Sequence, residues 1–209
     1  MRIAKEGWPL ILPAAAVALM ALLLGWVVVG VALAVLTIAI AAFFRDPERK
    51  IPTGDGLVVA PADGRIVAIA PVEGNALFAD AVTRISIFLS PLDVHINRAP
   101  VAGRVSAVRY QAGKFIAAFK EEATRYNEQN ALHMVDERER NLGVVQVAGV
   151  VARRIVCRAK AGDILSRGER FGLIMFGSRT DIYLPQSCRL EATEGQRVTG
   201  GETIIGRFP

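Results

Sequence analysis

The chain has 209 residues, 52% of them apolar, with a mean hydropathy of +0.36 and a formal net charge of +5. This composition excludes a wholly disordered chain, and its apolar excess is too large for an ordinary soluble protein. Residues 46–209 hold 22 basic and 19 acidic residues, which is too even for the basic stripe of a nucleic-acid reader. Because Cys157 and Cys188 lack a Cys-x-x-Cys spacing, we expect two reduced thiols and no metal site.

A long apolar segment opens the chain. No charged residue stands between Gly7 and Phe44, and this run is about twice as long as one membrane-crossing helix of ~20 residues. Since Gly25 and Trp26 lie near its middle, we expect residues 1–45 to form an apolar helical hairpin that spans a membrane or dips into one leaflet. A single long tilted helix and a buried core hairpin are the alternatives. The flanking basic residues place both ends in the cytoplasm by the positive-inside rule; they are Arg2, Lys5, Arg45, Arg49 and Lys50.

The hydrophobic period changes after Asp46-Pro47 and Ile51-Pro52, because a residue before proline is disfavoured in a helix. Residues 46–209 predict one mainly β (α+β) domain, a β-barrel or sandwich built from short apolar runs between glycines and prolines. The expected strands are Gly64–Ala70, Arg84–Leu89, Gly103–Tyr110, Gly143–Ala148, Arg153–Arg158, Leu173–Phe176 and Asp181–Leu184. Only Lys120–Glu139 lacks this rhythm, and we interpret it as a polar excursion with one turn of helix. His133 lies within it and is expected at the surface.

Two kinds of internal repetition appear in this domain. Ala60–Ile66 matches Ala99–Val105, and each is expected to start a strand after a Pro-x-x-Gly turn. Residues 161–172 and 194–206 share a pattern of spaced glycines. Such segments resemble the hammerhead strands of biotinyl/lipoyl-type barrels, a likeness that concerns the fold and not the function.

The most informative motif places Gly177 and Ser178 directly after an apolar strand, in the sequence Phe171–Asp181. This motif resembles the self-cleavage site of the phosphatidylserine decarboxylases. Two further segments resemble motifs of the short form of that family: the Phe-Phe-Arg-Asp-Pro junction at Phe43–Pro47, and Leu-Ser-Pro-Leu-Asp-Val-His-Ile-Asn-Arg at Leu89–Arg98. The resemblance covers essentially the whole chain.

The resemblance implies that the bond between Gly177 and Ser178 breaks, giving a β chain of residues 1–177 and an α chain of residues 178–209. The residue types suit this chemistry, because glycine has no Cβ to keep the serine hydroxyl from the preceding carbonyl. An N-to-O acyl shift gives an ester, and β-elimination followed by hydrolysis leaves a covalent pyruvoyl group in place of Ser178.

Serine is a poor nucleophile at its ordinary pKa and needs an adjacent base. His95 is the best candidate, since it is one of only two histidines and titrates near neutrality. The resemblance assigns Asp63, in the Pro-Ala-Asp-Gly turn, as the acidic partner that orients the imidazole. His95 is also a candidate proton donor in turnover. Asn97 and Arg98 are candidate contacts to the lipid headgroup, although solvation of a sheet edge explains them nearly as well. Arg179 is a candidate contact to the lipid phosphate or carboxylate, and an exposed arginine near a strand end is an equal alternative.

The implied function is conversion of phosphatidylserine to phosphatidylethanolamine through a Schiff base between the pyruvoyl carbonyl and the substrate amine. The expected location is the cell membrane, with the catalytic domain on the cytoplasmic side, and a homodimer is implied. One alternative is the same chemistry on an archaeal-type ether serine lipid. Another is a membrane-anchored carrier or adaptor without catalysis; it needs an exposed modifiable lysine, for which only Lys114, Lys120 and Lys160 follow residue 50.

Overall fold

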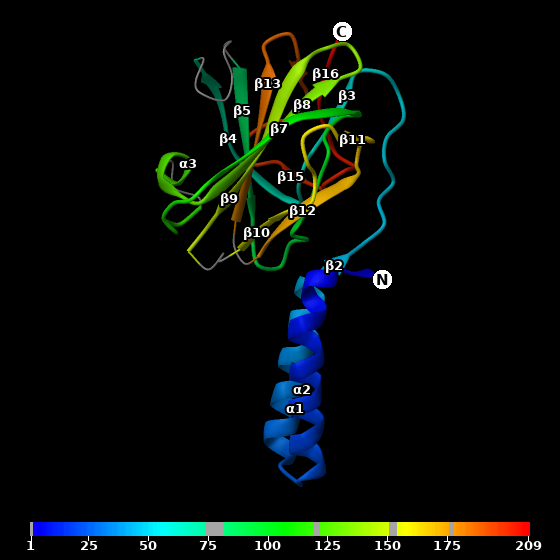
Figure 1. The fold of residues 1–209 in the computed structure, drawn as a ribbon, viewed down its shortest axis with the longest axis vertical. Coiled ribbons are helices and arrows are strands. Elements are labelled where there is room, and N and C mark those ends of the chain that lie inside the picture. Colours follow the sequence, from blue (N-terminus) through cyan, green and yellow to red (C-terminus); the bar gives the residue numbers. More distant parts are fainter. Residues whose placement is uncertain (1, 74–81, 119–121, 151–153, 176–177) are drawn as a thin grey trace. The chain divides into compact units, whose positions relative to one another are not determined.

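The structure, a computed structural model, describes residues 2–73, 82–118, 122–150, 154–175 and 178–209. The chain divides into two compact units, residues 1–48 and 49–209. The ribbon is shown in Figure 1. Gly177, the residue before the expected cleavage point, lies outside the described residues, as do Lys120, Arg153 and Phe176.

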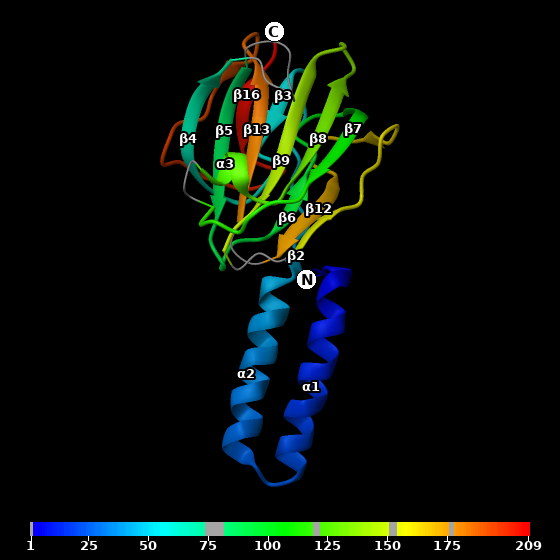
Figure 2. The ribbon, with the colours of Figure 1, turned by 60° about the vertical axis from the view of Figure 1, so that its left-hand side comes forward.

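The first unit contains the expected pair of helices, which lie side by side (Figure 2). A 3-10 turn, η1 (Lys5–Gly7), leads into α1 (Trp8–Leu23), and α2 (Val27–Phe43) returns. Gly25 provides the left-handed backbone of the connecting turn, at φ +78°. Two short strands, β1 (Arg2–Ile3) and β2 (Arg45–Asp46), pair antiparallel. Both polar ends of the hairpin are thereby tied together.

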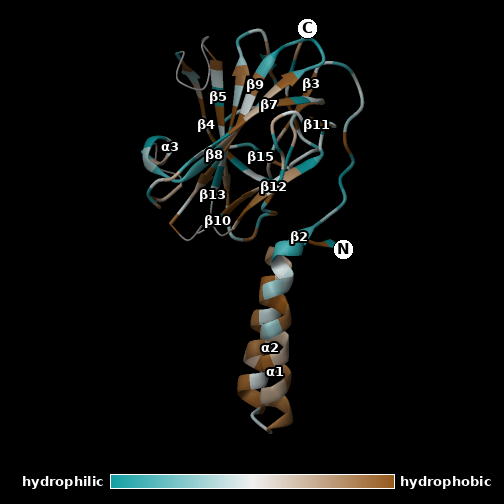
Figure 3. Cartoon of the chain, in the orientation of Figure 1, coloured by the Kyte–Doolittle hydropathy of each residue, from teal (hydrophilic) through white to brown (hydrophobic). Residues whose placement is uncertain are grey.

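The hairpin exposes most of its large apolar side chains. Leu23, Val28 and Ile38 are 68–83% exposed, and most of the ribbon of both helices has the colour of hydrophobic residues in Figure 3. By length and composition, Lys5–Leu23 can cross a membrane, properties that it shares with some core helices of soluble proteins and with signal sequences. Contiguous exposed apolar surface is typical of a site that contacts a membrane or another protein.

The second unit is mainly β, as expected. Its largest sheet has eight strands in the order β11-β7-β8-β9-β13-β5-β4-β15, and two three-stranded sheets have the orders β10-β12-β6 and β14-β16-β3. All pairings between these strands are antiparallel. The bounds are β3 (Leu57–Val59), β4 (Gly64–Val72), β5 (Val82–Leu89), β6 (Ile96–Arg98), β7 (Gly103–Gln111), β8 (Gln129–Asp136), β9 (Asn141–Ala148), β10 (Arg154–Cys157), β11 (Ile164–Leu165), β12 (Arg170–Met175), β13 (Ser178–Pro185), β14 (Arg189–Leu190), β15 (Arg197–Val198) and β16 (Ile204–Arg207).

The main apolar core draws on all three sheets. Ile66 of β4, Leu132 of β8 and Ile182 of β13 meet Phe171 of β12 and Ile205 of β16 there, each at most 1% exposed. Successive side chains of a strand point to opposite faces, so within each strand every second residue points into the core. The strand β13 is buried on both faces and lies between β5 and β9 in the large sheet (Figure 2).

The two sequence repeats adopt matching pairings. Ile66 exchanges backbone hydrogen bonds with Gly195 and Gln196, and Val105 does the same with Gly162 and Asp163. The short strands β15 and β11 pair with β4 and β7 at these places. The expected strand starts at residues 64 and 103 are confirmed, whereas the finer expectation of hammerhead elements stays a prediction.

The polar segment Lys120–Glu139 corrects one expectation. It contains the expected single turn of helix, α3 (Ala123–Tyr126), but Gln129–Asp136 forms a full strand, β8, between β7 and β9. Its inward side chains include Leu132 and Met134, which lie in the main core. His133 therefore lies half-buried in a sheet rather than at the surface of a loop, and burial together with Arg109 lowers its pKa.

Candidate active site

Ser178 is the first residue of β13, at the centre of the large sheet. It pairs with Leu89 of β5 on one side and with Ala148 of β9 on the other, and it is fully buried. Within the described part of the chain, no group hydrogen-bonds the Ser178 hydroxyl. A buried hydroxyl without a partner costs about 1–3 kcal/mol. Such a group is unusual in a folded protein, and its occurrence marks this position as a candidate for chemistry.

The two faces of β13 separate Ser178 from Arg179. Since side chains alternate along a strand, Ser178 and Thr180 share a face with the core residue Ile182, and Arg179 and Asp181 occupy the other face. Arg179 forms a two-pronged ion pair with Asp181, with Nε–Oδ1 at 2.8 Å and Nη2–Oδ2 at 2.9 Å. Its Nη1 donates to the Ala118 carbonyl at 2.9 Å, and its Nη2 donates to Thr124. The structure does not bring Arg179 to the side of Ser178, and with 3% of its surface exposed Arg179 is not the exposed arginine of the alternative expectation.

The ring orientation of His95 follows from its contact with Asp93. The imidazole is buried, and its Nδ1 lies 2.9 Å from the backbone carbonyl oxygen of Asp93. A carbonyl oxygen only accepts, so Nδ1 carries the hydrogen and donates it. In neutral His95 the lone pair is therefore on Nε2, which is the nitrogen available to take a proton.

Asp93 holds the loop that presents this carbonyl. Its Oδ2 accepts hydrogen bonds from the backbone N–H of Ser90 at 2.8 Å and from the Ser90 hydroxyl at 2.7 Å. Its Oδ1 is paired with Arg197. Asp93 lies in the motif Leu89–Arg98, but the sequence reasoning gave it no role. Its contacts identify it as the residue that fixes the acceptor for His95.

One contact relates the strand after His95 to the strand that begins at Ser178. The amide nitrogen of Asn97 donates to the hydroxyl of Thr180 at 2.9 Å. His95 stands two residues before Asn97, and Ser178 stands two residues before Thr180. Side chains two residues apart in extended chain lie on the same side, so His95 shares a side with Asn97 and Ser178 shares a side with Thr180. Among the described residues, no hydrogen bond joins the Ser178 hydroxyl to His95.

Asp63 lies in the turn before β4, and its carboxylate is held by other groups than His95. Arg49 Nη2 donates to both carboxylate oxygens, at 3.0 and 2.8 Å, and the backbone N–H of Gly200 donates at 2.8 Å. Among the described residues, no hydrogen bond of Asp63 goes to His95. Burial raises the pKa of Asp63 above its ordinary value, against the opposing effects of Arg49 and of Gly200, and the nearby Asp93 charge raises it further.

Arg98 and Asn97 both form hydrogen bonds with other residues of the chain. Arg98 Nη1 donates to the Gly168 carbonyl at 2.9 Å, and the residue is 4% exposed. Asn97 is fully buried, with both ends of its amide engaged, because its oxygen also accepts from Gln146 at 2.9 Å. Neither Gln146 nor Thr180 carried a sequence signal, since only the strand register reveals their partners. Among the described residues, no group of three or more His, Cys, Asp or Glu side chains is placed to hold a metal ion.

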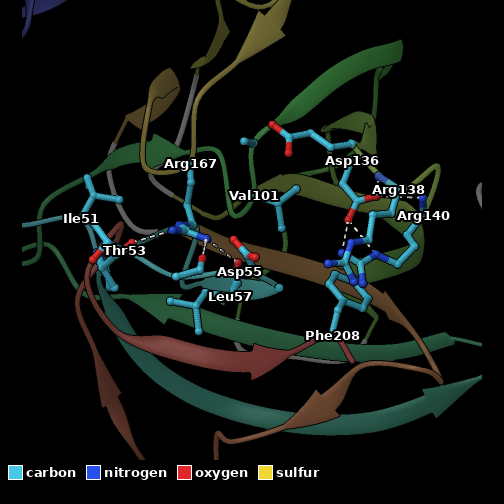
Figure 4. A pocket seen from close by; sticks show the side chains of 15 residues that line it. Ile51, Thr53, Asp55, Leu57, Val101, Asp136, Arg138, Arg140, Arg167 and Phe208 are labelled. Atoms are coloured by element: carbon cyan, nitrogen blue, oxygen red, sulfur yellow. Dashed lines mark hydrogen bonds and ion pairs between the residues drawn. The ribbon is translucent and has the colours of Figure 1, made fainter.

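A cavity of about 480 Å³ elsewhere in this unit contains none of the predicted site residues (Figure 4). Its arginines are bound to the protein. Arg167 donates to the carbonyls of Pro52 and Gly54, at 2.7 and 2.9 Å, and Arg140 pairs with Asp136 at 2.7 Å. Asp55 and Glu137 add negative charge to the same lining, so the cavity has no excess of positive charge with which to attract a phosphate.

Comparison with known proteins places this geometry in a family. The family model described as phosphatidylserine decarboxylase matches residues 36–206. The phosphatidylserine decarboxylase proenzyme of Symbiobacterium thermophilum is 47% identical over 99% of this chain and 96% of its own length. Those of Aromatoleum aromaticum and Geotalea uraniireducens are 46% and 44% identical, again over 99% of this chain, and over 96% and 97% of their own lengths. The matched region includes the buried serine, the histidine and the aspartate described above, and the chain belongs to the phosphatidylserine decarboxylase family.

Proposed function

We propose that the chain is a proenzyme that cleaves itself at Ser178 and then decarboxylates phosphatidylserine to phosphatidylethanolamine. The observation that carries the proposal is the buried, unpartnered hydroxyl of Ser178 at the start of a central strand, in a chain of this family. A nucleophile in a dry site reacts without first shedding a shell of water. Family membership gives this serine its chemistry, and the strand pairing gives it its fixed position.

Self-cleavage in this proposal uses Ser178 and His95. Nε2 of His95 takes the hydroxyl proton, and Oγ of Ser178 attacks the carbonyl carbon of Gly177. His95 then passes this proton to the peptide nitrogen, which is released as an amine as the ester forms. Elimination across Cα–Cβ of Ser178 frees the Gly177 carboxylate and leaves dehydroalanine, and water then replaces the nitrogen, which leaves as ammonia. The Asp93 carbonyl supports the first step because it holds the proton of His95 on Nδ1.

Asp63 stays in the proposal as the acidic partner that the family resemblance implies. Its carboxylate lies close enough to Asp93 for the two charges to interact, and Asp93 stands two residues before His95. A carboxylate in this neighbourhood stabilises an imidazolium through space. Arg49 forms an ion pair with Asp63. In this proposal its positive charge weakens the electrostatic effect of the Asp63 carboxylate on His95.

The same position suits the covalent pyruvoyl group that forms from Ser178. The residue is enclosed by β5 and β9 and excluded from water, and its hydroxyl makes no hydrogen bond among the described residues. The pyruvoyl group supplies an electron-withdrawing carbonyl, which the loss of CO₂ from an amino acid headgroup requires. In turnover, His95 protonated at Nε2 is the proposed donor of the proton to the carbon that loses CO₂.

The predicted headgroup contacts are less well placed than these residues. Asn97, Arg98 and Arg179 are buried, and each makes hydrogen bonds to other parts of the chain. Their roles toward substrate stay predictions. The hairpin of residues 1–48 offers a surface for lipid, and the flanking basic residues favour a cytoplasmic position for residues 49–209 at the cell membrane. The resemblance also implies a homodimer.

The test follows the covalent fate of the chain and of the lipid together. The wild-type protein, purified in detergent, is expected to give two fragments whose masses match residues 1–177 and 178–209, the smaller one blocked to Edman degradation. It is also expected to release ¹⁴CO₂ from phosphatidylserine labelled in the serine carboxyl group. Ser178→Ala removes the nucleophile and is expected to stay intact and inactive.

Ser106→Ala is the matched control, because Ser106 is an exposed serine of β7 and its loss is expected to change nothing. An active wild-type protein of full, uncleaved mass would contradict the proposal. Diester and ether forms of the serine lipid, offered side by side, decide whether the glycerol linkage matters.

A further inference from the structure

A chain of buried polar side chains crosses four strands next to Ser178. Asn130 of β8 donates to Gln146 of β9 at 3.1 Å, Gln146 donates to Asn97 of β6 at 2.9 Å, and Asn97 donates to Thr180 of β13 at 2.9 Å. Three of these residues are fully buried, and Asn130 is 4% exposed. We name these four residues the amide ladder. Through Asn97 it links the three-stranded sheet containing β6 to the large sheet containing β13.

Strand register places the ladder beside the reacting residues. Gln146 is the direct partner of Thr180 on one side and of Asn130 on the other, so three of its members lie in one row across the large sheet. Asn97 belongs to the other sheet and reaches this row from β6. The contact between Asn97 and Thr180 therefore sets how β6 and β13 lie against each other, one two-residue step from His95 and Ser178.

The local backbone leaves space for this arrangement. Gly172 of β12 pairs with Asn97 and with Cys157. A Cβ at Gly172 would lie 2.2 Å from the Val156 carbonyl oxygen and 3.0 Å from Nε2 of Gln146. The amide of Gln146 also donates to that carbonyl, at 3.3 Å. Only glycine allows β12 to approach the ladder so closely.

Buried amides are a costly way to join two sheets if stability alone is needed. Each must satisfy its hydrogen bonds, and apolar residues of similar size often serve stability as well or better. What amides add is direction, because a hydrogen bond weakens steeply when its angle or length changes. A ladder with every member engaged holds one relative position of the strands where apolar packing would permit several.

We propose that the amide ladder positions His95 against Ser178, with Asn97, Gln146 and Thr180 as positioning residues for the proton transfer. The inference rests on the proposed function. It also gives Asn97 a different role from the headgroup contact expected from the sequence, because both ends of its amide are used within the ladder. A misplacement of reacting groups by about 1 Å can cost 10²-fold in rate.

The test compares Thr180→Val with Thr180→Ser in the full-length precursor, synthesised in a cell-free system with lipid vesicles and sampled over time on gels. Valine keeps the shape of threonine and loses the hydroxyl, so the rate of self-cleavage is expected to fall about tenfold to a hundredfold. Serine keeps the acceptor for Asn97 and is expected to stay within about threefold of wild type. For the cleaved enzyme, we expect Thr180→Val to lower kcat with KM changed less than about twofold.

Ile205→Val is the matched control for stability. Ile205 lies fully buried in β16, in the main core and outside the ladder, and its expected result is a lowered melting temperature with normal cleavage. Gln146→Met is a second ladder variant, which decides the matter should Thr180→Val fail to fold; it is expected to slow cleavage in the same way.

Three results would overturn the inference: wild-type cleavage by Thr180→Val, an equal loss in Thr180→Ser, or an equal loss in Ile205→Val. Wild-type protein that neither cleaves nor decarboxylates would instead defeat the proposed function itself.

Discussion

At the scale of single residues, the contribution of the ion pair between Arg49 and Asp63 to the free energy of unfolding can be measured. Both side chains are mostly buried, with 11% and 17% exposed, and the Nη2–Oδ2 distance is 2.8 Å. Removal of one partner from such a pair leaves a charge with little water around it, which is more harmful than removal of both. The pair therefore lends itself to a double-mutant cycle.

Arg49→Met is expected to lower the free energy of unfolding by about 1–3 kcal/mol at neutral pH, a range reduced from that of fully buried pairs because some water remains. Asp63→Asn on this background is expected to recover part of the loss. Both are measured by thermal unfolding, followed by circular dichroism, in the uncleaved Ser178→Ala protein in detergent. Equal stability of Arg49→Met and its parent would show that the pair contributes nothing.

The pH dependence of that loss has a defined sign. Burial raises the pKa of Asp63 above its ordinary value of 3.8, so the folded state holds this proton to higher pH than the unfolded state does. The resulting contribution to stability is complete below pH 3.8 and is lost as the pH rises through the folded-state pKa. Without Arg49 the folded-state pKa rises further, so the deficit of Arg49→Met is expected to shrink on acidification, and Asp63→Asn is expected to abolish this trend.

At the scale of secondary structure elements, residues 178–209, the proposed small fragment, contribute strands to the sheets. Its strand β13 pairs with β5 along its whole length and with β9 over most of it. Its strands β15 and β16 pair with β4 and β3 of the other fragment. Its buried side chains include Leu184 and Phe208, and burial of a large apolar side chain contributes about 1.5–3 kcal/mol.

We therefore expect the two products of cleavage to stay associated without a covalent link. In size-exclusion chromatography in mild detergent, both fragments should elute together at the volume of the uncleaved Ser178→Ala protein. They should separate only when denaturant unfolds the sheets. Loss of the small fragment during native purification would show that these pairings do not hold it.

The elements also show what sequence patterns can and cannot predict. All seven expected strands are present, and the Pro-x-x-Gly repeat correctly located the starts of β4 and β7, because alternation and turn chemistry are local properties. The strand β8 was missed because two of its four inward positions are polar. Asn130 belongs to the amide ladder, and Asp136 accepts hydrogen bonds from Arg138 and Arg140. At these two positions polar contacts with other residues take the place of apolar packing, so the alternation of apolar residues is interrupted.

The candidate site shows the same division. Motifs pointed to Ser178, His95 and Asp63, whose residue types suggest chemistry on their own. The roles of Gln146 and Thr180 depend on which strands become neighbours and in which register. The role of Asp93 depends on the folded loop that brings it to Ser90 and His95. Arg179 shows that neighbours in sequence can be separated in the fold. It follows Ser178 directly, and it therefore lies on the opposite face of β13, where it pairs with Asp181.

At the scale of the whole molecule, the lengths of the two helices agree with the proposed membrane role of the hairpin. The helices α1 and α2 have 16 and 17 residues, which corresponds to about 24–26 Å at 1.5 Å per residue. That is close to the ~30 Å hydrocarbon thickness of a bilayer. Both polar ends of the hairpin lie at the β1–β2 pair, and a membrane hairpin has such ends on one side.

The full chain is therefore expected to behave as an integral membrane protein and to remain with the membrane after a wash in alkaline carbonate, because exposed apolar side chains such as Val28 and Ile38 lose their lipid cover on release. A shortened chain of residues 49–209, which contains the whole main core, is expected to leave the membrane yet still cleave at Ser178. Release of the full chain by carbonate would contradict the membrane role of the hairpin, and failure of the folded shortened chain to cleave would show that self-processing requires the hairpin as well.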